Sequence, residues 1–190
     1  MKKVTLSTFI LISLLFAHTV IAQTKTRAVS VPKSVMEAEF KTVDGSAPIR
    51  LANYTGEVAV LLLWASWCAP CRAAVAGLND INKEFSSRGV EVIGLTLEDP
   101  ESGADSVSEF MQNSKVDYKM GWINKEMTTA LLSLPDAGQA HSDQSGSIPQ
   151  ILVINSEDLM IKRFIGYSSE RTPAKLRETI ERELNNPTTK

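Results

Sequence analysis

The chain has 190 residues, of which 43% are hydrophobic and 22% are charged. This composition is close to that of soluble globular proteins, so it excludes a wholly disordered chain and an all-membrane protein. A formal net charge of -2 leaves no basic excess for binding nucleic acid. The length predicts one globular domain, which typically takes roughly 100 to 200 residues, with additional segments at its ends.

Residues 1–22 have the pattern of an export signal. Lys2 and Lys3 precede an apolar run over residues 4–17, and Val20-Ile21-Ala22 has the small-residue character of a cleavage site. We expect cleavage after Ala22, which takes the net charge from -2 to -4 because two lysines are lost. An uncleaved membrane anchor is the alternative, because the apolar stretch approaches the roughly 20 residues that span a bilayer. The protein is therefore predicted to be extracytoplasmic, in the periplasm, or tethered to the membrane by this segment.

Residues 23–36 are polar without clear periodicity, which predicts a flexible spacer before a folded domain over residues 37–187. Residues 39–43 and 48–51 flank Asp44-Gly45, a dipeptide suited to the positive φ angles of a tight turn. An N-terminal β-hairpin is predicted there.

An unbroken apolar run over residues 58–63 predicts a central strand that is covered on both faces. From Cys71 onward, apolar residues recur at helical spacing, and Gly89 is placed to end that helix. The remaining predicted elements are strands at 90–97, 118–122, 151–154 and 161–165, and helices at 105–113, 125–134 and 172–184, the last with Thr172 as N-cap and Pro173 at the first helical position. Alternating strands and helices predict an α/β fold with one mixed sheet flanked by helices.

Cys68 and Cys71 form a Cys-x-x-Cys motif between the predicted central strand and its helix. Free backbone N–H groups and the helix dipole favour a negative charge on the first sulfur, so Cys68 is the predicted nucleophile and Cys71 the resolving cysteine. Closed zinc sites need four ligands, and this chain has no second cysteine pair. Covalent haem attachment would need a histidine directly after the second cysteine, and that residue is Arg72. An inert structural disulfide remains an alternative.

Residues 60–72, Val-Leu-Leu-Leu-Trp-Ala-Ser-Trp-Cys-Ala-Pro-Cys-Arg, resemble the active-site segment of the TlpA/ResA-type thioredoxin-like thiol:disulfide oxidoreductases. The resemblance extends from the region of Phe40 to the last helix. It implies a thioredoxin-like fold and an exported reductase that acts on disulfides of other exported proteins, for example in cytochrome c maturation. It also implies a membrane thiol carrier as electron donor.

The same resemblance assigns supporting roles around the cysteines. Trp67 would shield Cys68, Pro70 would tune the redox potential, and Ile148-Pro149 would form the cis-proline loop that faces the sulfurs. A cis bond costs little only before proline, and the backbone of Ile148 could pair with an extended substrate. The alternative for Pro149 is an ordinary turn proline.

Several positions depart from the pattern of the family. Leu62 stands where thioredoxins carry a buried aspartate, Ala76 replaces a helix-kinking proline, and Gln150 replaces the threonine that commonly follows the cis-proline. Glu98 and Asp99 follow a predicted strand at the sheet edge where ligand-handling loops gather. Either could transfer protons for Cys71, with a solvated turn carboxylate as the alternative interpretation.

Residues 135–146 form a polar, turn-forming stretch that carries His141 and could be a specificity loop. A copper metallochaperone using Cys68, Cys71 and His141 is the alternative function, because soft thiolates suit Cu(I). The leading prediction has no metal and no cofactor beyond the redox-active Cys68–Cys71 disulfide. We expect a monomer whose partners are disulfide-bearing exported proteins.

Overall fold

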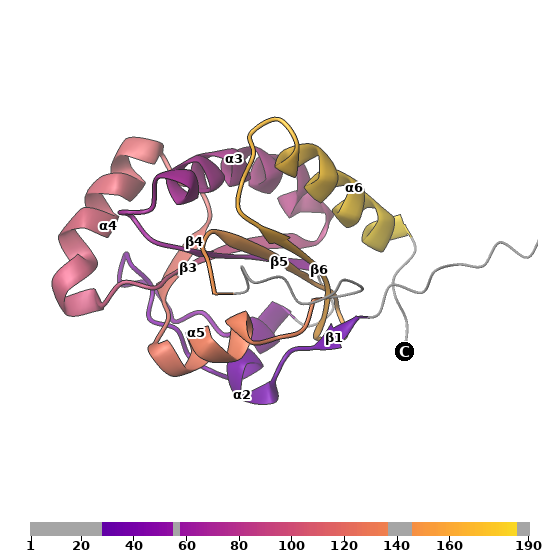
Figure 1. Ribbon diagram of the computed structural model, residues 1–190, viewed down its shortest axis with the longest axis horizontal. Helices are drawn as coiled ribbons and strands as arrows, with labels where there is room; N and C mark the ends of the chain where they lie inside the picture. The colour runs from indigo at the N-terminus through magenta and orange to yellow at the C-terminus, as the bar shows by residue number, and fades with distance from the viewer. Residues whose placement is uncertain (1–27, 55–57, 137–145, 186–190) are drawn as a thin grey trace, which may run out of the picture.

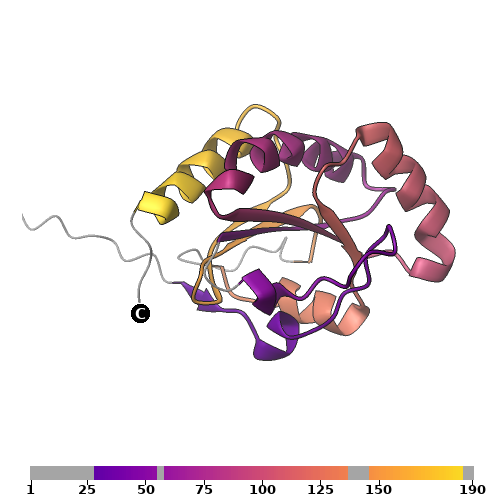
Figure 2. The same ribbon diagram turned by 180° about the vertical axis from the view of Figure 1, so that it is seen from behind.

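The computed structural model describes residues 28–54, 58–136 and 146–185. One sheet lies between two layers of helices (Figure 1), and the same layering is seen from behind in Figure 2. The strands are β1 (Val29–Ser30), β2 (Val58–Trp64), β3 (Val90–Thr96), β4 (Lys119–Trp122), β5 (Gln150–Ile154) and β6 (Leu159–Ile165). The helices are α2 (Lys33–Met36), α3 (Ala69–Phe85), α4 (Pro100–Ser114), α5 (Lys125–Leu132) and α6 (Thr172–Asn185), with short 3-10 turns at Leu51–Tyr54 and Ser86–Arg88.

The sheet has the strand order β1-β6-β5-β2-β3-β4. Strand β2 lies parallel to β3 and antiparallel to β5, and β5 continues antiparallel to β6. The predicted mixed sheet is thereby confirmed. Because β2 has neighbours on both sides, the loop that leaves its carboxyl end is held at the middle of the sheet edge.

The residues of β2 explain its central place. All seven are buried, as the continuous apolar run predicted. Val58, Val60 and Leu62 face the core under α3, α4 and α6, while Leu61 and Leu63 face the second core, against α2 and α5. Successive side chains of a strand point to opposite faces, so one apolar segment supports both layers.

Helix α3 follows the predicted apolar periodicity. Val75, Leu78, Ile81 and Phe85 are all buried against the sheet. After the helix and the 3-10 turn, Gly89 takes a left-handed conformation with φ of 81°, which glycine adopts without steric cost. The predicted end of this helix is confirmed.

The prediction of a flexible spacer over residues 23–36 is wrong for its second half. Val29 pairs with Met160 in the sheet, and α2 buries Val35 and Met36 in the core beneath it. These elements are too short to show a period in the sequence, and burial against distant residues stabilises them. The folded domain therefore begins before residue 37.

The predicted N-terminal hairpin is reduced to one antiparallel bridge. Phe40 and Ile49 exchange two backbone hydrogen bonds of 2.8 and 2.9 Å, and Gly45 at the turn has φ of 74°. Thr42 forms a further antiparallel bridge with Gly121 in β4. The segment thus extends the edge of the main sheet.

Two helix starts differ from the prediction. Helix α4 begins at Pro100 instead of residue 105, because the Asp99 carboxylate caps it by accepting from the backbone N–H groups of Glu101 and Ser102. Thr172 is the first residue of α6, and its hydroxyl accepts a hydrogen bond from the N–H of Ser168 at 3.0 Å. Helix α5 ends at Leu132, two residues earlier than predicted.

Within the described residues, no helix is both long enough and apolar enough to cross a membrane. The predicted export signal at residues 1–22 lies outside the described part of the chain. The same holds for residues 137–145, and so for His141 and most of the predicted specificity loop.

Candidate active site

The two cysteines lie where β2 passes into α3. Cys68 is the N-cap of α3, in an extended conformation, and Cys71 lies in its first turn. They form a disulfide with a Cα–Cα distance of 5.2 Å. Because the first backbone N–H groups of a helix have no partner within it, the predicted placement of Cys68 at a positive helix end is confirmed.

The two cysteines differ in their access to solvent. Cys68 retains 7% exposure and Cys71 none, and both belong to the core cluster beneath α3. An incoming reagent can therefore reach Cys68 before Cys71. The predicted roles of nucleophile and resolving cysteine require this order of access.

A cis peptide bond joins Ile148 to Pro149, as the resemblance implied. The Sγ atom of Cys68 lies 3.8 Å from the carbonyl oxygen of Ile148, although 80 residues separate them. The N–H of Gly166 donates to the carbonyl of Pro149 at 2.9 Å, so this loop is attached to the end of β6. Gln150 then begins β5 and pairs with Leu63 in β2.

Trp67 and Pro70 flank the first cysteine. Trp67 is 71% exposed, the one large hydrophobic side chain so exposed among the described residues. Pro70 lies within the first two positions of α3, where its missing N–H costs no helical hydrogen bond. Both residues are exposed and lie within two positions of Cys68 in the chain.

Glu98 holds the turn that precedes the cysteines. Its carboxylate accepts hydrogen bonds from the N–H of Ser66 at 2.8 Å, from the hydroxyl of Ser66 at 2.6 Å and from the hydroxyl of Thr96 at 2.8 Å. The partly buried side chain is thus anchored and is not a solvated turn carboxylate. Ser66 and Thr96 were not predicted from the sequence, although Ser66 stands only two residues before Cys68.

The neighbouring Asp99 serves α4 as its N-cap, so its carboxylate is committed to backbone N–H groups. Beside Glu98 lies a pocket of about 500 Å³, with walls that include Phe40, Leu97 and Trp122. Leu62 is fully buried in the same core cluster as Cys71, so the position of the thioredoxin aspartate is apolar here.

Arg163 is a third residue that was not predicted from the sequence. Its guanidinium donates to the carbonyl of Leu131 at 3.0 Å and to that of Leu132 at 3.3 Å, and lies 3.3 Å from the Asp136 carboxylate. Burial lowers the pKa of Arg163, and Asp136 opposes that shift. This arginine anchors the end of α5, from which the chain continues toward the cis-proline loop.

The described residues contain no group of three histidine, cysteine or acidic side chains arranged to hold a metal ion. His141, the third ligand of the copper alternative, lies outside the described residues. No observation in the described part of the chain favours the metallochaperone.

A Cys-x-x-Cys disulfide at a helix start, facing a cis-proline loop on a mixed sheet, defines a thioredoxin-like redox protein. The chain belongs to the AhpC/TSA family, whose model matches residues 31–162. The expected similarity to ResA-type proteins is also confirmed.

The thiol-disulfide oxidoreductase ResA of Oceanobacillus iheyensis is 32% identical over 76 residues, which is 40% of this chain and 39% of that relative. The thiol:disulfide interchange protein DsbE of Vibrio cholerae is 28% identical over 153 residues, 78% of this chain and 72% of the relative. A similar fold is seen in the crystal structure of a thiol:disulfide interchange protein, a thioredoxin family protein from Chlorobium tepidum. The two structures have a TM-score of 0.65 and 22% sequence identity, over 83% of this chain and 97% of that one.

Proposed function

We propose that this protein is an exported thiol:disulfide oxidoreductase that reduces disulfides of extracytoplasmic proteins through Cys68 and Cys71. The observation that carries the proposal is the disulfide at the start of α3, of which only Cys68 reaches the surface. The nearby carbonyl of Ile148 and the cis-proline complete the arrangement.

The reaction begins from the dithiol form. The Cys68 thiolate attacks one sulfur of a client disulfide, the client S–S bond breaks, and the other client sulfur leaves as a thiolate that takes up a proton. Cys71 then loses its proton and attacks the Cys68 sulfur, which releases the second client thiol and closes the Cys68–Cys71 disulfide. Two electrons pass from the protein to the client, and the same steps reversed would oxidise a dithiol.

A client chain has a place to bind during this exchange. The backbone of Ile148 lies against the sulfur of Cys68 and could pair with an extended client segment, as in strand addition. The exposed indole of Trp67, the residue directly before Cys68, offers apolar surface for the same client.

The cellular setting rests on the predicted signal at residues 1–22 and on the family resemblance. An exported reductase must be reduced again after each turnover, and we propose a membrane thiol carrier as the electron donor. Client proteins of cytochrome c maturation are the first candidates. Measuring the equilibrium of the Cys68–Cys71 pair against glutathione distinguishes a reductase from an oxidase, since only the reduction potential differs.

Trapping of clients tests the proposal directly. Cys71→Ser cannot resolve the mixed disulfide, so client proteins are expected to remain attached to Cys68 and to be released by a reducing agent. Cys68→Ser is the matched control and should trap none. The proposal fails if Cys71→Ser protein, produced in its own compartment, carries no more attached protein than the control.

A further inference from the structure

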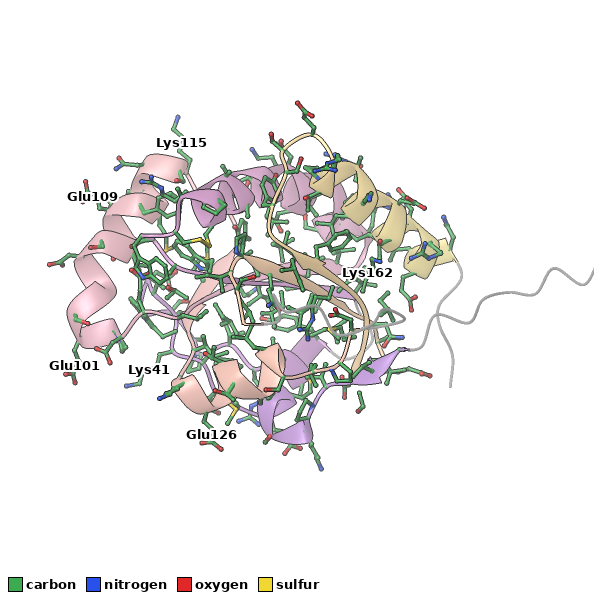
Figure 3. All side chains as sticks on the ribbon, viewed as in Figure 1. Lys41, Glu101, Glu109, Lys115, Glu126 and Lys162 are labelled. Atoms are coloured by element: carbon green, nitrogen blue, oxygen red, sulfur yellow. A yellow bond between two sulfur atoms is a disulfide. The ribbon has the colours of Figure 1, made fainter. Side chains whose placement is uncertain are left out.

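A cavity of about 440 Å³ lies between the end of β6, the loop at residues 166–171 and the first turn of α6. Four basic residues line it: Lys162 and Arg163 on β6, Arg171 in the loop and Lys175 in α6. Val153, directly opposite Lys162 in β5, belongs to the core beneath α3 and α6, which places Lys162 on that face of the sheet. Figure 3 labels Lys162 near α6.

Lys162, Arg171 and Lys175 carry the positive charge that the cavity presents. Within the described ranges, none of the three basic side chains forms an ion pair, whereas Arg50, Arg88 and Arg177 each pair with a glutamate. Arg163 contributes to the wall, but its guanidinium is committed to the opposite face. A local excess of positive charge in a chain of net charge -2 predicts an anionic ligand.

The walls of the cavity are held in place. The phenol of Tyr167 lies so close to Gly77 in α3 that a Cβ atom there would be 1.8 Å from its oxygen. Ser168 accepts from the N–H of Thr172 at 2.8 Å and from that of Arg171 at 3.2 Å. The loop is therefore tied both to the active-site helix and to α6, and the basic groups are presented on a preformed surface.

The cavity is connected to the redox centre through the cis-proline loop. Gly166, in the wall of the cavity, donates to the carbonyl of Pro149, and the preceding carbonyl of Ile148 contacts the sulfur of Cys68. Lys162 lies four positions before Gly166 along β6, or about 13 Å at the rise of a strand. An extended client chain that passes beside Gly166 therefore reaches Lys162 within about four further residues.

We propose that this cavity binds carboxylate side chains of client proteins and selects clients that are acidic near the reacting cysteine. The inference rests on the proposed function, because the ligand is part of the chain whose disulfide is reduced. Acidic side chains about four residues beyond the point where the client passes Gly166 would lie beside Lys162, Arg171 and Lys175. Such charge complementarity speeds encounter and favours one class of partner.

The test uses two disulfide-bonded peptides that differ only in having Glu or Gln at those flanking positions. We expect reduced wild-type protein to reduce the acidic peptide about tenfold faster, measured as kcat/KM. The triple variant Lys162→Gln, Arg171→Gln, Lys175→Gln should bring that ratio to within about twofold of unity. A matched triple variant with the same change of charge, Lys33→Gln, Lys83→Gln, Lys115→Gln, should keep the tenfold ratio.

Salt gives a second measurement that needs no variant. Raising ionic strength from about 0.05 to about 0.5 M should reduce the ratio for wild-type protein, because exposed charges are screened. The inference is overturned if wild-type protein reduces the two peptides at equal rates, or if the preference for the acidic peptide survives in the Lys162, Arg171 and Lys175 triple variant. In either case, reduction of the Gln peptide would still support the proposed function. Failure to reduce either peptide would remove the proposed function itself.

Discussion

Replacing Glu98 by alanine removes the acceptor of three hydrogen bonds, two from Ser66 and one from Thr96. Thr96 is fully buried, so its hydroxyl cannot turn to water in compensation. Hydrogen bonds to a charged group contribute about 1.5 to 3 kcal/mol when buried, and partial exposure of Glu98 reduces this to about 1 kcal/mol each. We therefore expect Glu98→Ala to lower the free energy of unfolding by about 3 kcal/mol.

Glu98→Gln separates the position of this side chain from its charge. The amide keeps one acceptor oxygen, and its NH₂ can donate to a hydroxyl that formerly donated, so the expected loss is about 1 kcal/mol. If Glu98 acts by holding the turn before Cys68, Glu98→Gln should exchange disulfides within about threefold of wild type, whereas Glu98→Ala should be about tenfold slower. The sequence-based hypothesis of proton transfer for Cys71 predicts instead that both variants are equally slow.

Two measurements decide between these outcomes. Urea unfolding of the disulfide form gives the free energies, and reduction of a model disulfide between about pH 5 and about pH 9 gives the rates. Glu101→Gln, an exposed carboxylate on α4 labelled in Figure 3, is the matched control for loss of charge. The positioning role is refuted if Glu98→Gln changes the pH dependence of the rate and slows exchange as much as alanine does.

Three further predictions concern stability. Arg163→Met should lower the free energy of unfolding by about 3 kcal/mol, because the α5 carbonyls and Asp136 lose a buried partner, while the exposed Arg182→Met should cost under about 0.5 kcal/mol by urea unfolding. Burial raises the pKa of Tyr118 well above 10.0, so the folded state keeps a proton that the unfolded state loses, and stability should fall as pH rises above that value. The stability of Tyr118→Phe, measured by thermal melts, should fall less steeply with pH above about pH 10. An unchanged slope would contradict this reasoning. Leu62→Asp should lower the free energy of unfolding by about 3 kcal/mol or more at about pH 8, because Leu62 is fully buried. The loss should be smaller at about pH 5, where the introduced carboxyl is neutral. Equal losses at the two pH values would argue that the site is hydrated.

The chemistry of this protein is largely contained in one contiguous stretch of sequence. The apolar run at residues 58–63, the Cys68–Cys71 spacing and the helical period that follows depend on neighbouring residues, so strand, motif and helix could be predicted together. The resemblance also placed Ile148-Pro149, and the structure brings that loop to the sulfur of Cys68. Short elements such as β1 and α2 escaped prediction because their stability comes from contacts with distant residues.

The surroundings of the motif were decided by tertiary structure. A register irregularity between β5 and β6 leaves Met160 paired with Ile154 and Lys162 paired with Val153, so Ile161 is an extra residue in β6. Lys162 consequently faces the α6 side of the sheet and Arg163 the α5 side. Strict alternation of side chains starting from Met160 would assign these two residues to the opposite faces. Glu98 likewise meets Ser66 across 32 residues of chain. Local sequence determines which residues form a strand or a helix, but which side chains meet depends on how those elements pair, because pairing register sets the face on which each side chain lies.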